Sequence, residues 1–277
     1  MLYTPSGNAV TLAFAKQLLT QMRLGKDTAP DLLNICLDAP RRIAESYGPE
    51  SIEVEDMYYR LDEELAQFLN YLYAQIAPEE VVVVLTSDHG TSPSYDAGIV
   101  ERDRFNAAQF QVIVNSFLCA QHGPGEWVVD YEDNNLYLNH TLIYNKGLDL
   151  AAIQNEAATF AMQFRGVSHA LSSTAMRSSY FGSGYGEKNS FYPRRSGDVV
   201  VNLMPGCIEE RPDVRSKSGS MYGYDTTVPL VLYGGGIPAR RVGRSVDMTS
   251  VAPTLAYLLD IPEPAASEGT VLEEFRK

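Results

Sequence analysis

An acidic residue, an imidazole and a glycine follow one another directly after a run of apolar residues. Residues 81–86 read VVVVLT, and Asp88, His89 and Gly90 come just after them. An apolar run without polar alternation predicts a strand buried on both faces of a parallel sheet. Ligands bind beyond the carboxyl ends of such strands. Because aspartate and histidine both ligate divalent metals, Asp88 and His89 are candidate metal ligands.

Cysteine and histidine are too scarce for most other metal sites. The cysteines show no Cys-x-x-Cys spacing, which argues against a disulfide framework and a thiolate zinc site. They are Cys36, Cys119 and Cys207. The histidines are His89, His122, His140 and His169. The last three have no ligand-like spacing to one another, so we expect ordinary surface or partly buried side chains.

Composition excludes several classes of function. The 277 residues are 45% hydrophobic and 21% charged, which is typical of a globular protein. The net charge of −13 argues against binding to nucleic acid and to anionic membranes. No stretch approaches the roughly 18 apolar residues of a membrane span. Residues 1–11 lack the basic start and apolar core of a signal peptide.

The elements expected to position Asp88 and His89 form a strand–helix–strand unit. Apolar spacing predicts a helix over residues 8–22, capped by Asn8, and a longer helix over 51–76, capped by Ser51. The run at 31–37 is predicted to be a strand. With the strand at 81–86, this order is the βαβ pattern of a parallel sheet.

The rest of the chain predicts an insertion followed by a return to the sheet. We expect strands at 109–123 and 127–139, a helix at 148–164, and extended segments at 167–174 and 199–207. A further buried strand at 227–237 and a capped helix at 247–262 follow. The predicted domains are therefore an α/β core of residues 1–99 and 206–277 and an α+β cap of residues 100–205.

Several stretches, in order along the chain, resemble one known family. They are GPESIEVEDMYYRLDEELAQFL at 48–69, LTSDHG at 85–90, RRSGDVVVNLMPG at 194–206, GSMYGYDTTVPLVLYGGGI at 219–237 and VDMTSVAPTLAYLLDIPEP at 246–264. Together they resemble the alkaline phosphatase superfamily, in its nucleotide pyrophosphatase/phosphodiesterase-like branch that contains the phosphate-irrepressible alkaline phosphatases. The resemblance implies an α/β fold, a parallel-sheet sandwich with helices on both faces and an α+β insertion.

The resemblance also implies a chemistry, in which two zinc ions clamp a phosphate ester while a threonine or serine attacks phosphorus. Asp88 and His89 match two of the family's ligands. At the positions of the other zinc, Arg41 stands where the family has Asp, Glu45 where it has His, and Ser218 where it has His. A guanidinium repels a dication and does not deprotonate to bind it. Asp38 lies three residues from the matching ligand position.

The family's nucleophile and first metal-binding Asp have no counterpart in this chain, which begins at a point that resembles the middle of the family. Thr91 neighbours the Asp-His pair but is not in an evident nucleophile turn. We expect either a fragment of a longer protein or a truncated gene product, for which the missing N-terminal portion or an oligomer partner supplies the rest.

Two interpretations remain open at each candidate site. Asp88 and His89 form either a residual divalent-metal site or a pair kept for hydrogen bonding in their loop, because two ligands do not fill a zinc shell. Arg41 and Arg42, joined by the arginines at 194 and 195, form either an anion-binding element in place of zinc or solvated surface pairs. In the second case Glu45 neutralises Arg41.

These observations predict a metal-dependent phosphate-ester hydrolase domain with an incomplete metal site, inactive as this chain. Zinc is the family's cofactor, and we expect none, or one weakly bound divalent ion, here. The alternatives are a non-catalytic domain that binds a phosphate ester or nucleotide, or that scaffolds, and a globular domain whose likeness to the family is purely structural. The resemblance also implies a periplasmic or secreted protein.

Overall fold

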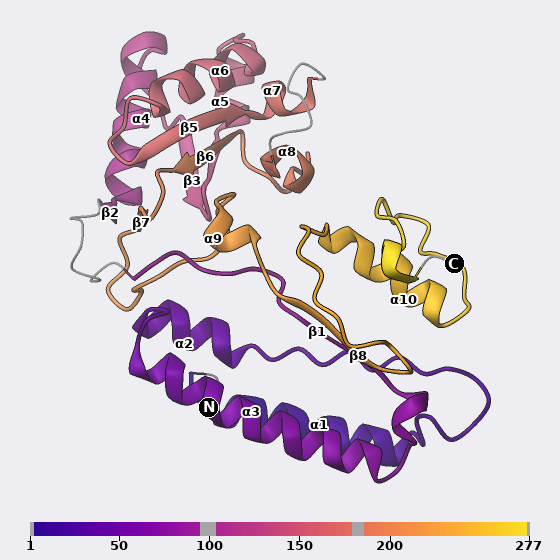
Figure 1. Cartoon of the computed structure of the whole chain (residues 1–277). Helices are drawn as coiled ribbons and strands as arrows, with labels where there is room; N and C mark the ends of the chain where they lie inside the picture. The colour runs from indigo at the N-terminus through magenta and orange to yellow at the C-terminus, as the bar shows by residue number, and fades with distance from the viewer. Residues whose placement is uncertain (1–2, 95–103, 179–185, 276–277) are drawn as a thin grey trace. The chain divides into compact units, whose positions relative to one another are not determined.

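The computed structural model describes residues 3–94, 104–178 and 186–275, which form a mixed α/β fold (Figure 1). The described residues cluster into two compact units. One contains residues 1–11, 37–66 and 85–230, and the other contains residues 12–36, 67–84 and 231–277. The expected boundaries between core and cap stay a prediction. No helix in the described residues has both the length and the apolar character needed to cross a membrane.

A four-stranded sheet forms the centre of the first unit, in the order β3-β4-β6-β5. Its strands are antiparallel and span Val128–Glu132 (β3), Asn135–Leu138 (β4), Val199–Leu203 (β6) and Val167–Ser172 (β5). Asp133 and Asn134 join β3 to β4 with φ of 43° and 64°. A two-residue turn with both residues at positive φ matches the twist of a hairpin, and Asp and Asn tolerate it well.

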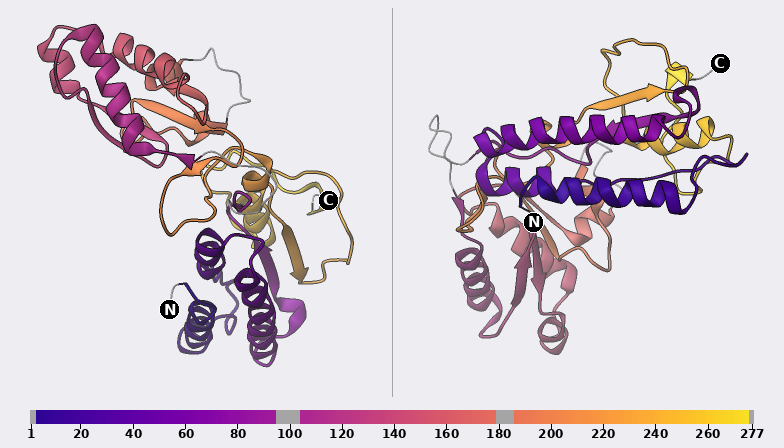
Figure 2. Two further views of the ribbon diagram at one scale, coloured as in Figure 1. Left: turned by 90° about the vertical axis from the view of Figure 1, so that its left-hand side faces the viewer. Right: turned by 90° about the horizontal axis from the view of Figure 1, so that it is seen from below.

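Two helices, α4 (Ala107–His122) and α6 (Leu150–Ala161), pack on this sheet (Figures 1 and 2). Between them in sequence lies the short helix α5 (His140–Asn145). The buried core that they share with the strands includes Phe105, Phe110, Val114, Leu118, Trp127, Leu136, Ile153, Ala157, Val199 and Val201. Short elements flank this region, namely β2 (Arg104–Phe105) paired in parallel with β7 (Ile208–Glu209), α7 (Ser173–Arg177) and α8 (Gly186–Ser190).

A second, smaller core in the first unit lies where α2 (Ala39–Tyr47) meets the start of α3 (Ile52–Tyr73). Ile43 of α2 packs there with Val54 and Met57 of α3. Pro40 stands in the first turn of α2, where the missing N–H costs nothing. As predicted, Ser51 caps α3, because its Oγ accepts a hydrogen bond from the backbone N–H of Val54 at 3.3 Å.

The second unit contains most of α1 (Ser6–Gln21) and the C-terminal end of α3, which meet at Thr20 and Tyr71, with hydroxyls 2.5 Å apart. It also holds η1 (Pro78–Glu80), η2 (Met248–Ser250), α10 (Val251–Leu258) and η3 (Glu273–Phe275). Most of the strands β1 (Val82–Thr86) and β8 (Leu230–Gly234), which pair with each other, also belongs to this unit. The predicted helix at 247–262 is confirmed, with Asp247 accepting from the backbone N–H of Thr249 at 3.0 Å.

Some expected elements were wrong. Residues 109–123 form the helix α4, not a strand, because Phe110, Val114 and Leu118 recur every four residues on one buried face. The β-branched residues at 112–114 had favoured the strand. Residues 31–37 form no strand, and Asn8 lies inside α1 rather than capping it.

The expectation that strand 81–86 is buried on both faces was also wrong. Within the described residues β1 pairs only with β8, and side chains remain open to solvent, with Leu85 47% exposed and Val231 50% exposed. An apolar run identifies a strand that favours burial, but tertiary contacts determine how much of it is covered.

Candidate functional site

The Asp88-His89 pair lies in the loop after β1, as the sequence predicted. The backbone N–H of His89 donates to Asp88 Oδ1 at 3.1 Å, and the imidazole Nε2 lies 3.7 Å from the same oxygen. His89 Nδ1 lies 2.7 Å from the carbonyl oxygen of Gly90. A carbonyl only accepts, so Nδ1 carries a proton, and in the neutral ring Nε2 holds the lone pair. Metal-ligating histidines commonly show this arrangement.

Gly90 seats the Asp-His loop on the short helix α9 (Gly223–Thr226). The backbone N–H of Gly90 donates to the carbonyl oxygen of Asp225 at 2.7 Å. A Cβ on Gly90 would lie 2.1 Å from the carbonyl oxygen of Tyr224, so only glycine permits this approach. Asp225 is itself buried, and its Oδ2 accepts from the backbone N–H of Ser220 at 2.6 Å. Helix α9 therefore ties the Asp-His loop to residues 218–220.

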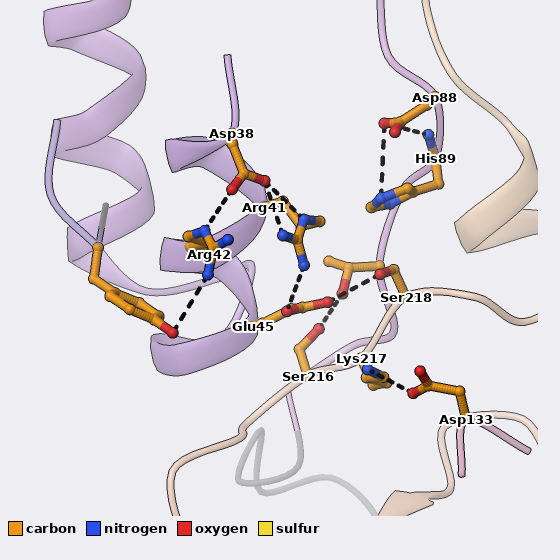
Figure 3. Close-up of polar contacts among 12 residues, drawn as sticks. Asp38, Arg41, Arg42, Glu45, Asp88, His89, Asp133, Ser216, Lys217 and Ser218 are labelled. Carbon is orange, nitrogen blue, oxygen red and sulfur yellow. Dashed lines mark hydrogen bonds and ion pairs between the residues drawn. The ribbon is translucent and has the colours of Figure 1, made fainter. Parts of the chain in front are cut away.

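Arg41, Glu45 and Ser218, the three residues predicted to stand at lost ligand positions, meet at Glu45, which contacts both of the others (Figure 3). Arg41 Nη1 donates to Glu45 Oε2 at 3.2 Å, and Ser218 Oγ donates to Glu45 Oε1 at 2.9 Å. The Glu45 side chain is only 17% exposed. Both of its carboxylate oxygens therefore accept hydrogen bonds within the protein. We call these three residues the Arg41–Glu45–Ser218 network.

Asp38 extends this network away from Ser218. Its Oδ1 accepts from Arg41 Nε at 2.9 Å, and its Oδ2 pairs with Arg42. Partial burial raises the pKa of the Asp38 carboxyl, but the hydrogen bonds and charges of Arg42 and Arg41 outweigh that effect, and the net pKa lies below its usual value. The two carboxylates balance the two guanidinium groups, since Glu45 and Asp38 each pair with arginine.

A ladder of contacts that sequence reasoning missed holds Ser218 in place. Two hydrogen bonds join Ser92 to Lys217. The Ser92 backbone N–H donates to the Lys217 carbonyl oxygen at 3.0 Å, and the Lys217 backbone N–H donates to Ser92 Oγ at 3.0 Å. Ser216 Oγ donates to the Ser92 carbonyl at 2.7 Å and contacts Thr91 Oγ1. The backbone N–H of Arg215 donates to the Glu45 carbonyl at 2.7 Å. The hydroxyl-rich spacing of residues 216–220 was the only signal in the sequence.

The other predicted site residues lie elsewhere. Each of the remaining histidines pairs with a carboxylate: His122 with Glu156 at 2.6 Å, His140 with Asp198 at 2.8 Å, and His169 with Glu187 at 3.0 Å. The guanidinium of Arg195 lies 5.0 Å from the ring of Tyr192, so its contact is with its own loop. In Figure 3 no dashed contact joins the Asp88–His89 pair to the Arg41–Glu45–Ser218 network.

These residues do not fit a zinc ion at the network. Arg41 brings a positive charge, Ser218 donates a hydrogen bond to Glu45, and both carboxylate oxygens of Glu45 accept hydrogen bonds. Across the parts of the chain that the structure describes, no group of three or more His, Cys, Asp or Glu side chains is placed to hold a metal ion. Asp88 and His89 offer two donors, and the assignment of all these positions to family ligands stays a prediction.

Several curated proteins match nearly the whole chain. It is 28% identical to a calcium-transporting ATPase of Myroides odoratus, over 98% of this chain and 51% of that protein. It is 27% identical to alkaline phosphatase PafA of Elizabethkingia meningoseptica, over 98% of this chain and 50% of that protein. It is also 27% identical to alkaline phosphatase PhoV of Synechococcus elongatus, over 99% and 50%. The chain thus spans about half the length of these relatives.

A solved structure and a family description agree with these matches. The crystal structure of alkaline phosphatase PafA superposes with a TM-score of 0.88 at 26% identity, covering 99% of this chain and 53% of that one. The fold is therefore that of the alkaline phosphatases, as the resemblance implied. The family described as type I phosphodiesterase / nucleotide pyrophosphatase matches residues 5–206, which is well over half of the chain. The chain belongs to the type I phosphodiesterase / nucleotide pyrophosphatase family, within the alkaline phosphatase superfamily.

Proposed function

We propose that this chain is a non-hydrolytic domain of a phosphoric-ester hydrolase family, in which the Arg41–Glu45–Ser218 network takes the place of one metal ion. One observation carries the proposal: Glu45 accepts hydrogen bonds from Arg41 and Ser218 through its two different oxygens. These contacts hold the Glu45 carboxylate beside the Arg41 guanidinium, so a cation bound to the same carboxylate would meet a positive charge. In a family whose chemistry uses two metals, losing one removes half of the electrostatic clamp on phosphate.

The charge balance supports a structural role for the network rather than a metal role. A bound zinc ion would meet Arg41, whose side chain is 35% exposed and lies between Asp38 and Glu45. Repulsion between the ion and the guanidinium would add to the cost of breaking both ion pairs. The network links α2 to the loop that carries Ser218, and in this way it replaces the cross-link that a metal ion would form in a relative.

A hydrolysis assay tests the proposal. The purified chain is incubated with 4-nitrophenyl phosphate and bis(4-nitrophenyl) phosphate, with and without added zinc, beside an Asp88→Ala variant. We expect the same background rate in every sample. Zinc-dependent turnover that Asp88→Ala abolishes would show an active hydrolase and overturn the proposal. Turnover that survives in Asp88→Ala would indicate a contaminating phosphatase, which a repeat purification with a second tag removes.

Restoring the family's ligand types provides a second test with a readout other than activity. The variant Arg41→Asp/Glu45→His/Ser218→His places three donors where the network stands. Its matched control is Arg41→Ala/Glu45→Ala/Ser218→Ala, which removes the network without adding donors. We expect the first variant, and not the control or the wild type, to bind zinc in equilibrium dialysis. Equal zinc binding by the wild type would contradict the proposal.

A second candidate function has one observation in its favour. His89 holds its Nδ1 on the Gly90 carbonyl and so presents Nε2 as a ligand beside Asp88. In this alternative a single divalent ion binds there, with further ligands from outside the chain, and the complete assembly hydrolyses phosphate esters. An exported location and a partner that supplies the missing portion are proposals of the same kind. A zinc titration in which His89→Ala abolishes binding would favour this alternative.

A further inference from the structure

A cavity of about 270 Å³ in the first unit is lined in part by Ser218, and the proposed function assigns no ligand to it. Its walls come from the β3–β4 turn, the end of β6 and the loop at 217–224. This volume lies just below the range of about 300–1,000 Å³ that holds drug-sized ligands. The cavity therefore suits a molecule with a single ring and a small substituent.

Two tyrosines form a rigid aromatic wall of the cavity. The rings of Tyr222 and Tyr224 lie 5.6 Å apart between centroids and are tilted by 36°. The hydroxyl of Tyr222 donates to the carbonyl oxygen of Leu203 at 2.8 Å, and the hydroxyl of Tyr224 accepts from the backbone N–H of Gly206 at 3.2 Å. Both rings are therefore anchored at their polar ends, so a ligand ring packs on them with little further loss of side-chain conformational entropy.

A cation stands on the polar side of the same cavity. Lys217 Nζ lies 3.5 Å from Asp133 Oδ1, and their side chains are 36% and 65% exposed. At this distance the ion pair is weak. Breaking it costs little free energy, because the Asp133 carboxylate is already mostly exposed to water. The backbone of Lys217 is fixed by its contacts with Ser92, so the ammonium group is presented from a rigid loop (Figure 3).

Two amides complete the polar side. Tyr131 Oη donates to Asn134 Oδ1 at 3.3 Å, which fixes that side chain and leaves its NH₂ group as a donor. Asn202, which is 8% exposed, also lines the cavity, and its Nδ2 lies 3.5 Å from His169 Nδ1. The remaining carboxylate in the wall, Glu209, accepts from Arg211 at 2.7 Å and is thereby neutralised. The polar side thus offers the Asn134 amide NH₂ group and the Lys217 ammonium group to an anion.

We propose that this cavity binds a small molecule made of one aromatic ring and one phosphate-like anionic group, with the ring on Tyr222 and Tyr224 and the anion on Lys217. The proposal rests on the proposed function, because it assigns a retained ligand to a domain that does not hydrolyse it. Binding exchanges the Asp133 carboxylate for the ligand's anion on Lys217. Ser218 lines the cavity too, so the ligand would border the Arg41–Glu45–Ser218 network.

Phenylphosphonate is the probe, because its carbon–phosphorus bond is not an ester and its binding does not depend on whether the domain hydrolyses esters. Isothermal titration compares it with phenol, which has only the ring, and with inorganic phosphate, which has only the anion. We expect phenylphosphonate to bind at least about tenfold more tightly than either part. Equal affinity for phenol or for phosphate would overturn the two-part ligand, and no binding of phenylphosphonate would overturn the site.

Variants on both sides of the cavity have opposite expected effects. Lys217→Met removes the cation and should weaken binding about tenfold or more, since a charge-assisted hydrogen bond is lost. Asp133→Asn removes the competitor for Lys217 and should tighten binding severalfold, and asparagine tolerates the positive φ of 43° at this position. Tyr224→Leu should weaken binding, whereas Tyr144→Leu, on the exposed side of α5, should not. Unchanged affinity in Lys217→Met and Tyr224→Leu would overturn the proposal.

Cysteine protection locates the bound probe independently of these variants. Cys207 lines the cavity, whereas Cys36 is exposed in the other unit and serves as an internal control. Phenylphosphonate should slow methylthiolation of Cys207, followed by mass spectrometry, and leave the rate at Cys36 unchanged. Binding without protection of Cys207 would place the probe elsewhere and overturn the assignment.

Discussion

Ser218 donates a hydrogen bond to Glu45 at 2.9 Å, although 173 positions of sequence separate the two residues. This contact connects the loop before α9 to helix α2 and directs one carboxylate oxygen of Glu45 toward the loop. The other oxygen accepts from Arg41. A cation, a carboxylate and a hydroxyl thus form hydrogen bonds and an ion pair at positions where the resemblance leads us to expect metal ligands.

Removing the Glu45 carboxylate should destabilise the first unit. Glu45→Ala leaves Arg41 and Ser218 without their shared acceptor, and we expect the free energy of unfolding in urea to fall by about 1–3 kcal/mol. Ser218→Ala removes one hydrogen bond and should cost about 1 kcal/mol. The control is Asp56→Ala, which breaks an ion pair to Arg60 whose two side chains are 53% and 60% exposed. A loss no larger than that of the control would contradict the prediction.

The stability contributed by Asp38 should disappear in acid. Its net pKa is lowered, mainly by Arg42 and Arg41 acting against partial burial, so the folded state binds this proton less readily than the unfolded state. The contribution is therefore present above the unfolded pKa and is lost as the pH falls through the folded pKa, below about pH 4. Chemical unfolding of wild type and Asp38→Asn from neutral to acidic pH measures it. The two curves should converge in acid, and a constant gap would refute the assignment.

A methyl group at Gly90 should displace the Asp-His loop. The added carbon would lie 2.1 Å from the carbonyl oxygen of Tyr224, a backbone atom that cannot rotate away. We expect Gly90→Ala to lower the free energy of unfolding by about 2 kcal/mol or more. The matched control is Gly223→Ala, at the start of α9, where an added Cβ would meet nothing within 4 Å. Equal stabilities of the two variants would show that the close approach is absent in solution.

The Asp198 carboxylate should be required for folding of the four-stranded sheet with its helices. It is 7% exposed and accepts from the backbone N–H of Leu138 at 2.7 Å, from His140 at 2.8 Å and from Gln154 at 2.6 Å. Asp198→Ala leaves the buried donors of Leu138 and Gln154 unpaired, and we expect a loss of about 3–5 kcal/mol.

A comparison within the same region isolates burial as the cause. His122 also pairs with a carboxylate, that of Glu156, whose side chain is 43% exposed. Glu156→Ala should therefore cost no more than about 1 kcal/mol. Thermal unfolding of both variants measures the difference. If Glu156→Ala were as destabilising as Asp198→Ala, desolvation would not explain the effect.

The sequence alone determined the family, the fold class and the candidate site residues. Local chemistry was sufficient for the long helix α3 and its Ser51 cap, because periodic apolar side chains and a capping hydroxyl act within one or two turns. The Asp88-His89 pair was likewise recognisable from the strand that precedes it. The helix α4 was misread as a strand, because the β-branched residues at 112–114 favour strands locally, although Phe110, Val114 and Leu118 recur at helical spacing.

Only the tertiary structure decided what Arg41, Glu45 and Ser218 do. Their types argued against a zinc site, yet the sequence left open whether Arg41 was solvated, neutralised or ready for an anion. That choice depends on which acceptor lies within about 3 Å of a guanidinium, and the nearest acceptors come from Asp38 and Glu45. Residues far apart in sequence meet only when the chain folds, so Ser218 on Glu45 and the tyrosine-walled cavity are properties of the fold.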